Sequence, residues 1–110
     1  MERVIQFLKE QNLYKEEFFD FMKHKTKVVS SDTPIEWFGC FPIVENDILK
    51  DIRLLVPEIK TEQNLLVNIH EYVHALELFN ELGNIYEERR EERENKARNM
   101  EKVYIKRKSI

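Results

Sequence analysis

Large apolar side chains recur at helical spacing in the first 23 residues, with Lys and Glu between them. The members of this stripe are Val4, Phe7, Leu8, Tyr14, Phe18, Phe21 and Met22. Such spacing buries one face of an amphipathic helix. It therefore predicts one helix over residues 2–23, with its aromatic face on the core. His24, which follows, is expected to be solvated or to cap this helix.

Two stretches rich in β-branched and aromatic residues predict strands after that helix. Residues 25–31 form the first stretch, and residues 35–45 form the second. Gly39 and Pro42 interrupt the second stretch, which indicates an edge strand or a bulge because proline cannot donate to a central ladder.

A third strand is predicted over residues 48–56, which are rich in Ile, Leu and Val and end at Pro57. The preceding Glu45-Asn46-Asp47 favours a hairpin turn. The apolar positions of this stretch also fit a helical period, so a helix over residues 47–56 remains the alternative.

A second amphipathic helix is predicted over residues 62–82. Thr61 is a suitable N-cap, and Gly83 suits the position after the helix end. The apolar face repeats at helical spacing through Leu65, Leu66, Ile69, Val73, Leu76 and Phe79.

The last predicted helix runs from 85 to about 104, with Asn84 as its N-cap. Its first half is almost entirely charged, which is typical of a solvated helix with ion pairs. Its second half regains apolar positions at Ala97, Met100, Val103 and Tyr104.

These elements predict an α+β fold in a single domain, residues 1–110. A hydrophobic content of 42% with 11% aromatic residues argues against disorder. The single cysteine, Cys40, cannot form an internal disulfide, so a reducing compartment is expected. No apolar run is long enough for a membrane span and no signal-peptide pattern is present, so we expect a soluble cytoplasmic protein with no membrane partner.

Charge is distributed unevenly along the chain. Residues 1–88 carry 9 Lys and Arg against 17 Asp and Glu, whereas residues 89–110 carry 9 against 4. The basic tail, residues 103–110, can be solvated, can dock on the acidic body of its own chain, or can bind nucleic acid. No interleaving of aromatic and basic residues supports nucleic acid, so none is expected.

The strongest chemical signal is His70-Glu71-Tyr72-Val73-His74 in the predicted helix 62–82. Residues four apart share a helix face, so both imidazoles can bind one zinc ion, Zn²⁺. Glu71 is rotated by about 100° from His70 and can act on a zinc-activated water as general base. The motif predicts metal-assisted hydrolysis of peptide bonds.

The remaining ligand of such a site must be a carboxylate. Catalytic zinc usually takes three protein ligands, and His24 lacks ligand spacing. The metzincin extension requires Gly and His where this chain has Glu77 and Asn80. A di-iron bundle needs two Glu-x-x-His units, and only Glu71-x-x-His74 is present.

The motif followed by a Glu-rich helix resembles the gluzincin metallopeptidases, which carry their third ligand on a downstream glutamate helix. The order of helix, three short strands, motif helix and charged helix resembles the minimal members called minigluzincins. The resemblance implies a zinc peptidase. The chain lacks the Asn-Glu-x-x-Ser-Asp box of larger relatives, so the third ligand stays open.

Hairpin geometry selects candidates for that ligand. If the two helices reverse about Gly83 and Asn84, His74 lies opposite a position near 93. Glu92 is then best placed, with Glu88 as the alternative if the motif helix ends early.

Other acidic residues are less suitable as ligands. Glu91 and Glu94 are expected to point elsewhere by helical angle. Glu77 and Glu81 share the histidine face of the motif helix itself.

Further expectations concern substrate and control. An edge strand over residues 36–44 can align an extended peptide or protein substrate. Tyr72, Tyr86 or Tyr104 can assist the oxyanion. The basic tail, from the same chain or from a neighbouring chain of a homo-oligomer, can occupy the cleft and hold the enzyme latent. The rival reading is a non-catalytic helical interaction module that uses the charged helix and the tail.

Overall fold

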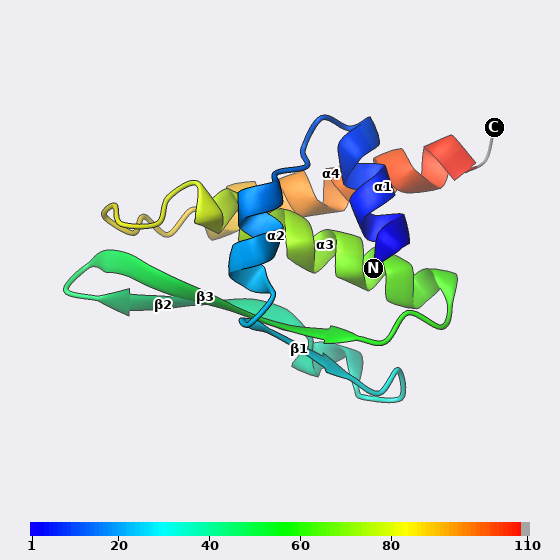
Figure 1. Cartoon of the computed structure of the whole chain (residues 1–110), viewed down its shortest axis with the longest axis horizontal. Helices are drawn as coiled ribbons and strands as arrows, with labels where there is room; N and C mark the ends of the chain where they lie inside the picture. The colour runs from blue at the N-terminus through cyan, green and yellow to red at the C-terminus, as the bar shows by residue number, and fades with distance from the viewer. Residues whose placement is uncertain (109–110) are drawn as a thin grey trace.

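A computed structural model describes residues 1–108 as four α-helices and a three-stranded sheet (Figure 1). This confirms the α+β class. The elements are α1 (Glu2–Glu10), α2 (Glu16–Met22), β1 (Thr26–Val29), a 3₁₀ turn (Ile35–Trp37), β2 (Gly39–Glu45), β3 (Ile48–Pro57), α3 (Glu62–Phe79) and α4 (Arg90–Lys108).

The sheet has the order β1-β3-β2, with β3 parallel to β1 and antiparallel to β2. Asn46 and Asp47 join β2 to β3 and have φ of 52° and 65°. Two positive φ values in a two-residue loop fit the twist of a hairpin, and Asn and Asp tolerate them. The predicted hairpin and third strand are confirmed, and the alternative helix over 47–56 is wrong.

The prediction of one helix over residues 2–23 is wrong, because the chain breaks between α1 and α2. Asn12 adopts φ of 58°, and the Leu13 amide donates to the Leu8 carbonyl at 2.8 Å. Asn is among the few residues that enter this left-handed conformation readily. The apolar stripe is still buried, but in two pieces that pack separately on the core.

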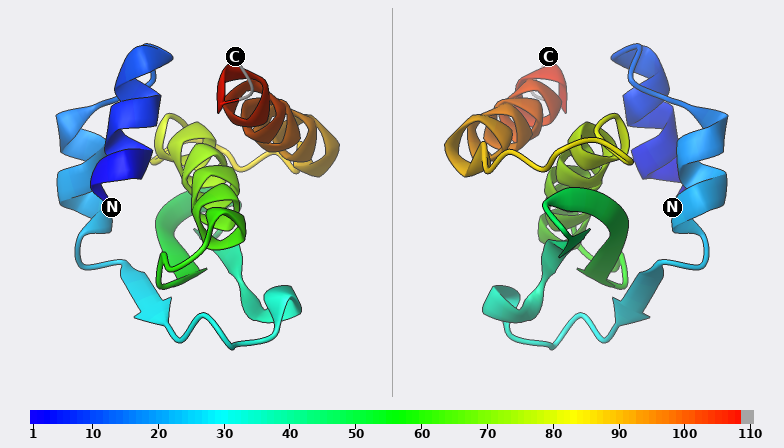
Figure 2. Two further views of the ribbon diagram at one scale, coloured as in Figure 1. Left: turned by 90° about the vertical axis from the view of Figure 1, so that its right-hand side faces the viewer. Right: turned by 90° about the vertical axis from the view of Figure 1, so that its left-hand side faces the viewer.

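The motif helix α3 lies at the centre of the molecule, between the sheet and α4 (Figure 2). A capping box starts it: the Asn64 amide donates to Thr61 Oγ1 at 3.1 Å, and the Thr61 amide donates to Asn64 Oδ1 at 3.1 Å. These bonds satisfy amides that the first turn leaves free. α3 ends at Phe79, three residues before the predicted end.

Residues 80–89 form a loop, where the sequence predicted a helix end and a new helix start. The Gly83 amide donates to the Leu49 carbonyl at 2.9 Å, and the Leu49 amide donates to the Asn84 carbonyl at 3.0 Å. Gly83 as the helix terminator and Asn84 as a cap are therefore both wrong. Contacts with β3, which local sequence does not reveal, delay the start of α4 to Arg90.

The second half of α4 packs on the core as predicted. Ala97 and Tyr104 are buried, and Met100 and Val103 pack against the core. Within the described part of the chain, no helix is long and apolar enough to cross a membrane.

The basic tail continues α4 as far as Lys108. Arg107 pairs with Glu10 at 2.9 Å, and Lys108 pairs with Glu62 at 2.5 Å. Arg107 and Lys108 of the tail thus dock on acidic residues of the same chain, which is one of the three alternatives left open for the tail. Occupation of the cleft by the tail stays a prediction. Residues 109–110 of the predicted tail lie outside the described residues.

Candidate metal centre

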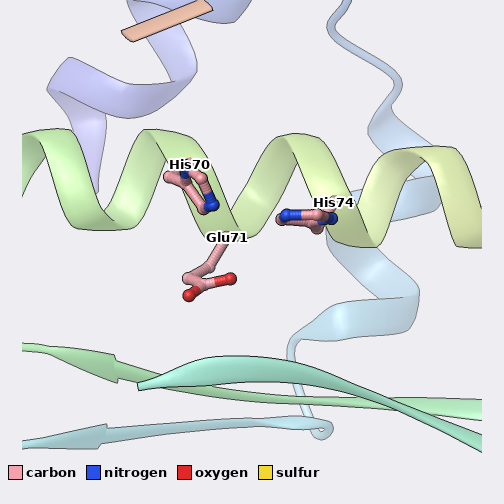
Figure 3. Close-up of side chains that lie close together, drawn as sticks. All are labelled: His70, Glu71 and His74. Atoms are coloured by element: carbon pink, nitrogen blue, oxygen red, sulfur yellow. The ribbon is translucent and has the colours of Figure 1, made fainter. Parts of the chain in front are cut away.

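His70 and His74 lie one turn apart on α3 (Figure 3). Their ring centroids are 4.9 Å apart. Both side chains are mostly buried, at 16% and 14% exposed. The helix therefore presents two imidazoles together at a partly enclosed surface, as the four-residue spacing predicts.

Glu71 points from α3 toward the sheet (Figure 3). Donor atoms of His70, Glu71 and His74 all lie within 4.8 Å of one another. Burial raises the pKa of Glu71 to about 7; the His70 charge opposes this, and the Glu94 and Glu101 charges add to it. At neutral pH this carboxyl group is close to the midpoint of its titration.

Two glutamates of α4 reach the histidine pair. Glu94 contacts both rings: its Oε2 lies 3.0 Å from His74 Nε2, and its Oε1 lies 3.3 Å from His70 Nε2. Glu101 Oε2 lies 3.1 Å from His70 Nδ1. Three nitrogen atoms of two imidazoles thus face carboxylate oxygens from one neighbouring helix.

Burial and these contacts shift the pKa values of His74 and Glu94. Burial lowers the pKa of His74, although the hydrogen bond to Glu94 acts in the other direction. Burial acts to raise the pKa of Glu94, but the hydrogen bond to His74 and the charges of His70, His74 and Arg98 lower it overall. A carboxylate and neutral imidazoles are the protonation states that bind metal ions.

The structure places Glu94, and not Glu92, against the histidines. Glu92 is exposed, and Glu88 lines the cleft from the loop. The expectation that Glu94 points elsewhere is wrong. α3 ends earlier and α4 begins later than predicted, which moves the midpoint of the hairpin by about one residue and turns a different face of α4 inward.

Two of the other glutamates considered as ligands, Glu77 and Glu81, form ion pairs with α4. Glu77 pairs with Lys96, and Glu81 pairs with Arg93. Glu91 is exposed. The two ion pairs join the end of α3 and the loop to α4, on the C-terminal side of the histidines.

A cleft of about 530 Å³ opens beside the histidine pair. Strand β2, α3, the loop and the start of α4 line it. The lining residues are Phe38–Pro42, His70, Glu71, His74, Leu78, Tyr86, Glu88, Arg90, Arg93 and Glu94. β2 pairs with β3 alone among the described strands, so its outer edge is free, as predicted for an edge strand.

Only one of the three candidate tyrosines lines this cleft. Tyr86 does so, from the loop. Tyr72 is buried in the core, and its ring stacks on Phe19. The Tyr104 hydroxyl donates to Glu62 at 3.0 Å, in contact with Arg3.

Comparisons of the chain with models of protein families, with curated proteins and with solved structures found no match.

Sequence reasoning missed Glu101 and Arg93 and set Glu94 aside. Glu94 and Glu101 are seven residues apart and so share one helix face, which is a signal that the sequence contains. Which face turns toward α3 depends on where α4 begins, and the loop decides that.

Proposed function

We propose that this chain is a zinc-dependent endopeptidase. One observation carries the proposal: the Nε2 atoms of His70 and His74 converge on the Glu94 carboxylate while Glu71 lies beside them uninvolved in that contact. Two imidazoles and one carboxylate are a ligand set of catalytic zinc sites.

Donor spacing supports zinc. Zinc binds His nitrogen and carboxylate oxygen at about 2.0–2.2 Å, so two tetrahedral ligands are about 3.4 Å apart. The distances between Glu94 oxygens and the two Nε2 atoms are 3.0 and 3.3 Å. His70, His74 and Glu94 would hold the ion with small adjustments.

Glu101 is not one of the proposed ligands, but its position supports the assignment of His70 as a zinc ligand. Its contact with His70 Nδ1 leaves His70 Nε2 directed at Glu94. Metal-binding histidines usually donate the second ring N–H to a carboxylate or carbonyl, which fixes the tautomer and the ring orientation.

Glu71 supplies the proton chemistry in this proposal. Zinc, when bound, lowers the pKa of a water molecule and polarises a peptide carbonyl. Glu71 accepts the proton from the attacking water and delivers it to the leaving amine. A carboxylate beside the proposed site that takes no part in the contact with Glu94 suits both steps, because it can accept a proton and then release it.

The free edge of β2 gives the substrate a binding mode. An extended peptide can add to this edge through main-chain hydrogen bonds, next to the residues of β2 that line the cleft. Tyr86 is the tyrosine available there to stabilise a developing oxyanion. A peptide or protein substrate is therefore proposed.

In the rival reading, a non-catalytic interaction module, the charged helix and the basic tail bind a partner. Arg107 and Lys108 instead pair with carboxylates of the same chain. No specific observation favours this reading, and we do not propose it.

The proposal is tested by zinc content and peptide cleavage together. Purified protein is loaded with zinc, dialysed, assayed for metal and incubated with a denatured protein mixture, with fragments identified by mass spectrometry. One zinc per chain and cleavage that a chelator abolishes and zinc restores are expected. Absence of both retained zinc and chelator-sensitive cleavage would reject the proposal.

A further inference from the structure

Arg93 precedes Glu94 on α4, and it is buried in a highly charged segment. It is 7% exposed, and it is the only buried charged residue among residues 1–108. A buried guanidinium is costly unless partners satisfy its hydrogen bonds. Its partners therefore indicate what the burial achieves.

Arg93 contacts residues near both ends of the loop 80–89. Its Nη2 donates to Glu81 Oε2 at 2.5 Å and to the Glu87 carbonyl at 3.0 Å. The guanidinium carbon lies 5.3 Å from the centroid of the Tyr86 ring. One side chain of α4 thus binds the loop where it leaves α3 and where it approaches α4.

The β2–β3 hairpin binds the same loop through its backbone. Besides the bonds between Leu49 and the Gly83-Asn84 pair, the Tyr86 amide donates to the Asp47 carbonyl at 2.8 Å. The loop is therefore held by the sheet and by Arg93, and these contacts fix where α4 begins.

The start of α4 decides which residue meets the histidines. Each residue turns a helix by about 100°, so a shift of one residue would move the Glu94 carboxylate away from both Nε2 atoms. Arg98 also contacts Glu94, at 3.1 Å, but Arg98 is 63% exposed, and an exposed ion pair contributes little.

We infer that Arg93 is a positioning residue for the metal centre. By joining Glu81 and the Glu87 carbonyl to α4, it holds Glu94 at His70 and His74. The inference rests on the proposed zinc site, and it assigns to Arg93 a role in metal affinity that its contacts with Glu81, Tyr86 and Glu87 do not reveal directly.

The test compares Arg93→Met with Arg107→Met in the full chain. Arg107 is also an α4 arginine that pairs with a glutamate, but at the far end of the helix. Zinc affinity is measured by competition with a chromophoric chelator. Arg93→Met is expected to bind zinc about tenfold or more weakly, as for residues that orient ligands, and Arg107→Met is expected to match the parent. Arg93→Lys should recover part of the loss, because it keeps one cation near Glu81.

Cobalt separates positioning from general destabilisation. The absorption spectrum of bound Co²⁺ reports coordination, so Arg93→Met is expected to shift toward the spectrum of Glu94→Gln, whereas Arg107→Met should not. Circular dichroism verifies folding; if Arg93→Met does not fold, Glu81→Gln replaces it, with a smaller shift in the same direction expected.

A folded Arg93→Met or Glu81→Gln protein with the parent's zinc affinity and cobalt spectrum would overturn the inference while leaving the proposed function intact. A parent chain that binds no zinc would overturn both.

Discussion

The two helices that form the candidate centre bring their residues to it in different ways. On α3, His70, Glu71 and His74 are brought together by helical spacing alone, and any helix over these residues would do the same. On α4, Glu94 and Glu101 reach the histidines only because the loop 80–89 sets the start of the helix. A local motif thus depends on a long-range contact for its completion.

The largest expected effect tests which glutamate completes the centre. Glu94→Gln should weaken zinc binding by more than about 100-fold, because it removes a proposed ligand rather than an outer partner. Glu92→Gln, two residues away and exposed, is the matched control and should bind zinc like the parent. A larger loss in Glu92→Gln than in Glu94→Gln, measured by chelator competition, would contradict the role of Glu94 and favour Glu92, the ligand predicted from sequence.

Glu101 should have a smaller effect on metal binding. Glu101→Gln removes the carboxylate from His70 Nδ1 but leaves the proposed ligands in place. Outer partners of this kind typically change affinity 10–100-fold, and that range is expected. A zinc affinity unchanged by Glu101→Gln would show that the His70 ring needs no support from α4.

Glu71 should make the stability of the metal-free protein depend on pH. Its folded pKa of about 7 is raised above the ordinary value of 4.5, so the folded state favours the protonated form. The contribution of protonated Glu71 to the stability of the folded state is complete below pH 4.5 and is lost as pH rises through about 7. Relative to Glu71→Gln, the chelated parent should lose about 2 kcal/mol of unfolding free energy over that range, allowing for partial exposure.

Urea denaturation of both chelated proteins at several pH values measures this difference. Titrating groups that do not interact with Glu71 are common to the parent and the variant, so they cancel in the comparison; the charges of His70, Glu94 and Glu101 act on Glu71 and are part of the measured difference. If the unfolding free energies of the two proteins change with pH in parallel, burial does not shift the pKa of Glu71.

The smallest expected effect concerns the loop. Gly83 has φ of 83°, and a Cβ there would meet no atom within 4 Å. Gly83→Ala should therefore cost only the backbone strain, about 1 kcal/mol. A loss above about 3 kcal/mol by urea denaturation would mean that the loop tolerates no adjustment, which would sharpen the contrast between the two helices.

Much of the fold could be predicted from the sequence because its signals are local. The α3 face, the Thr61 cap and the β2–β3 hairpin each follow from a few neighbouring residues. The break at Asn12 was missed because the apolar stripe continues across it. No proline, which would force the helix to end, lies between residues 2 and 23.

The candidate site divides in the same way. The convergence of His70, Glu71 and His74 was predicted from spacing, whereas Glu94, which contacts both histidines, was expected to point elsewhere. The loop bonds of Gly83 and Asn84 with Leu49 join residues more than 30 positions apart in the sequence. A shift of about one residue in the hairpin is too small for periodicity to resolve, yet it rotates α4 enough to exchange the glutamate that faces α3.

Glu71→Gln tests the central claim most directly, with zinc content and peptide hydrolysis measured on the same preparation. Glu71 is proposed to move protons and not to bind the ion, so the variant should retain one zinc per chain. Its turnover should fall by about 10²–10⁴-fold, the usual contribution of a general base. Hydrolysis at the parent's rate by the zinc-loaded variant would contradict the account.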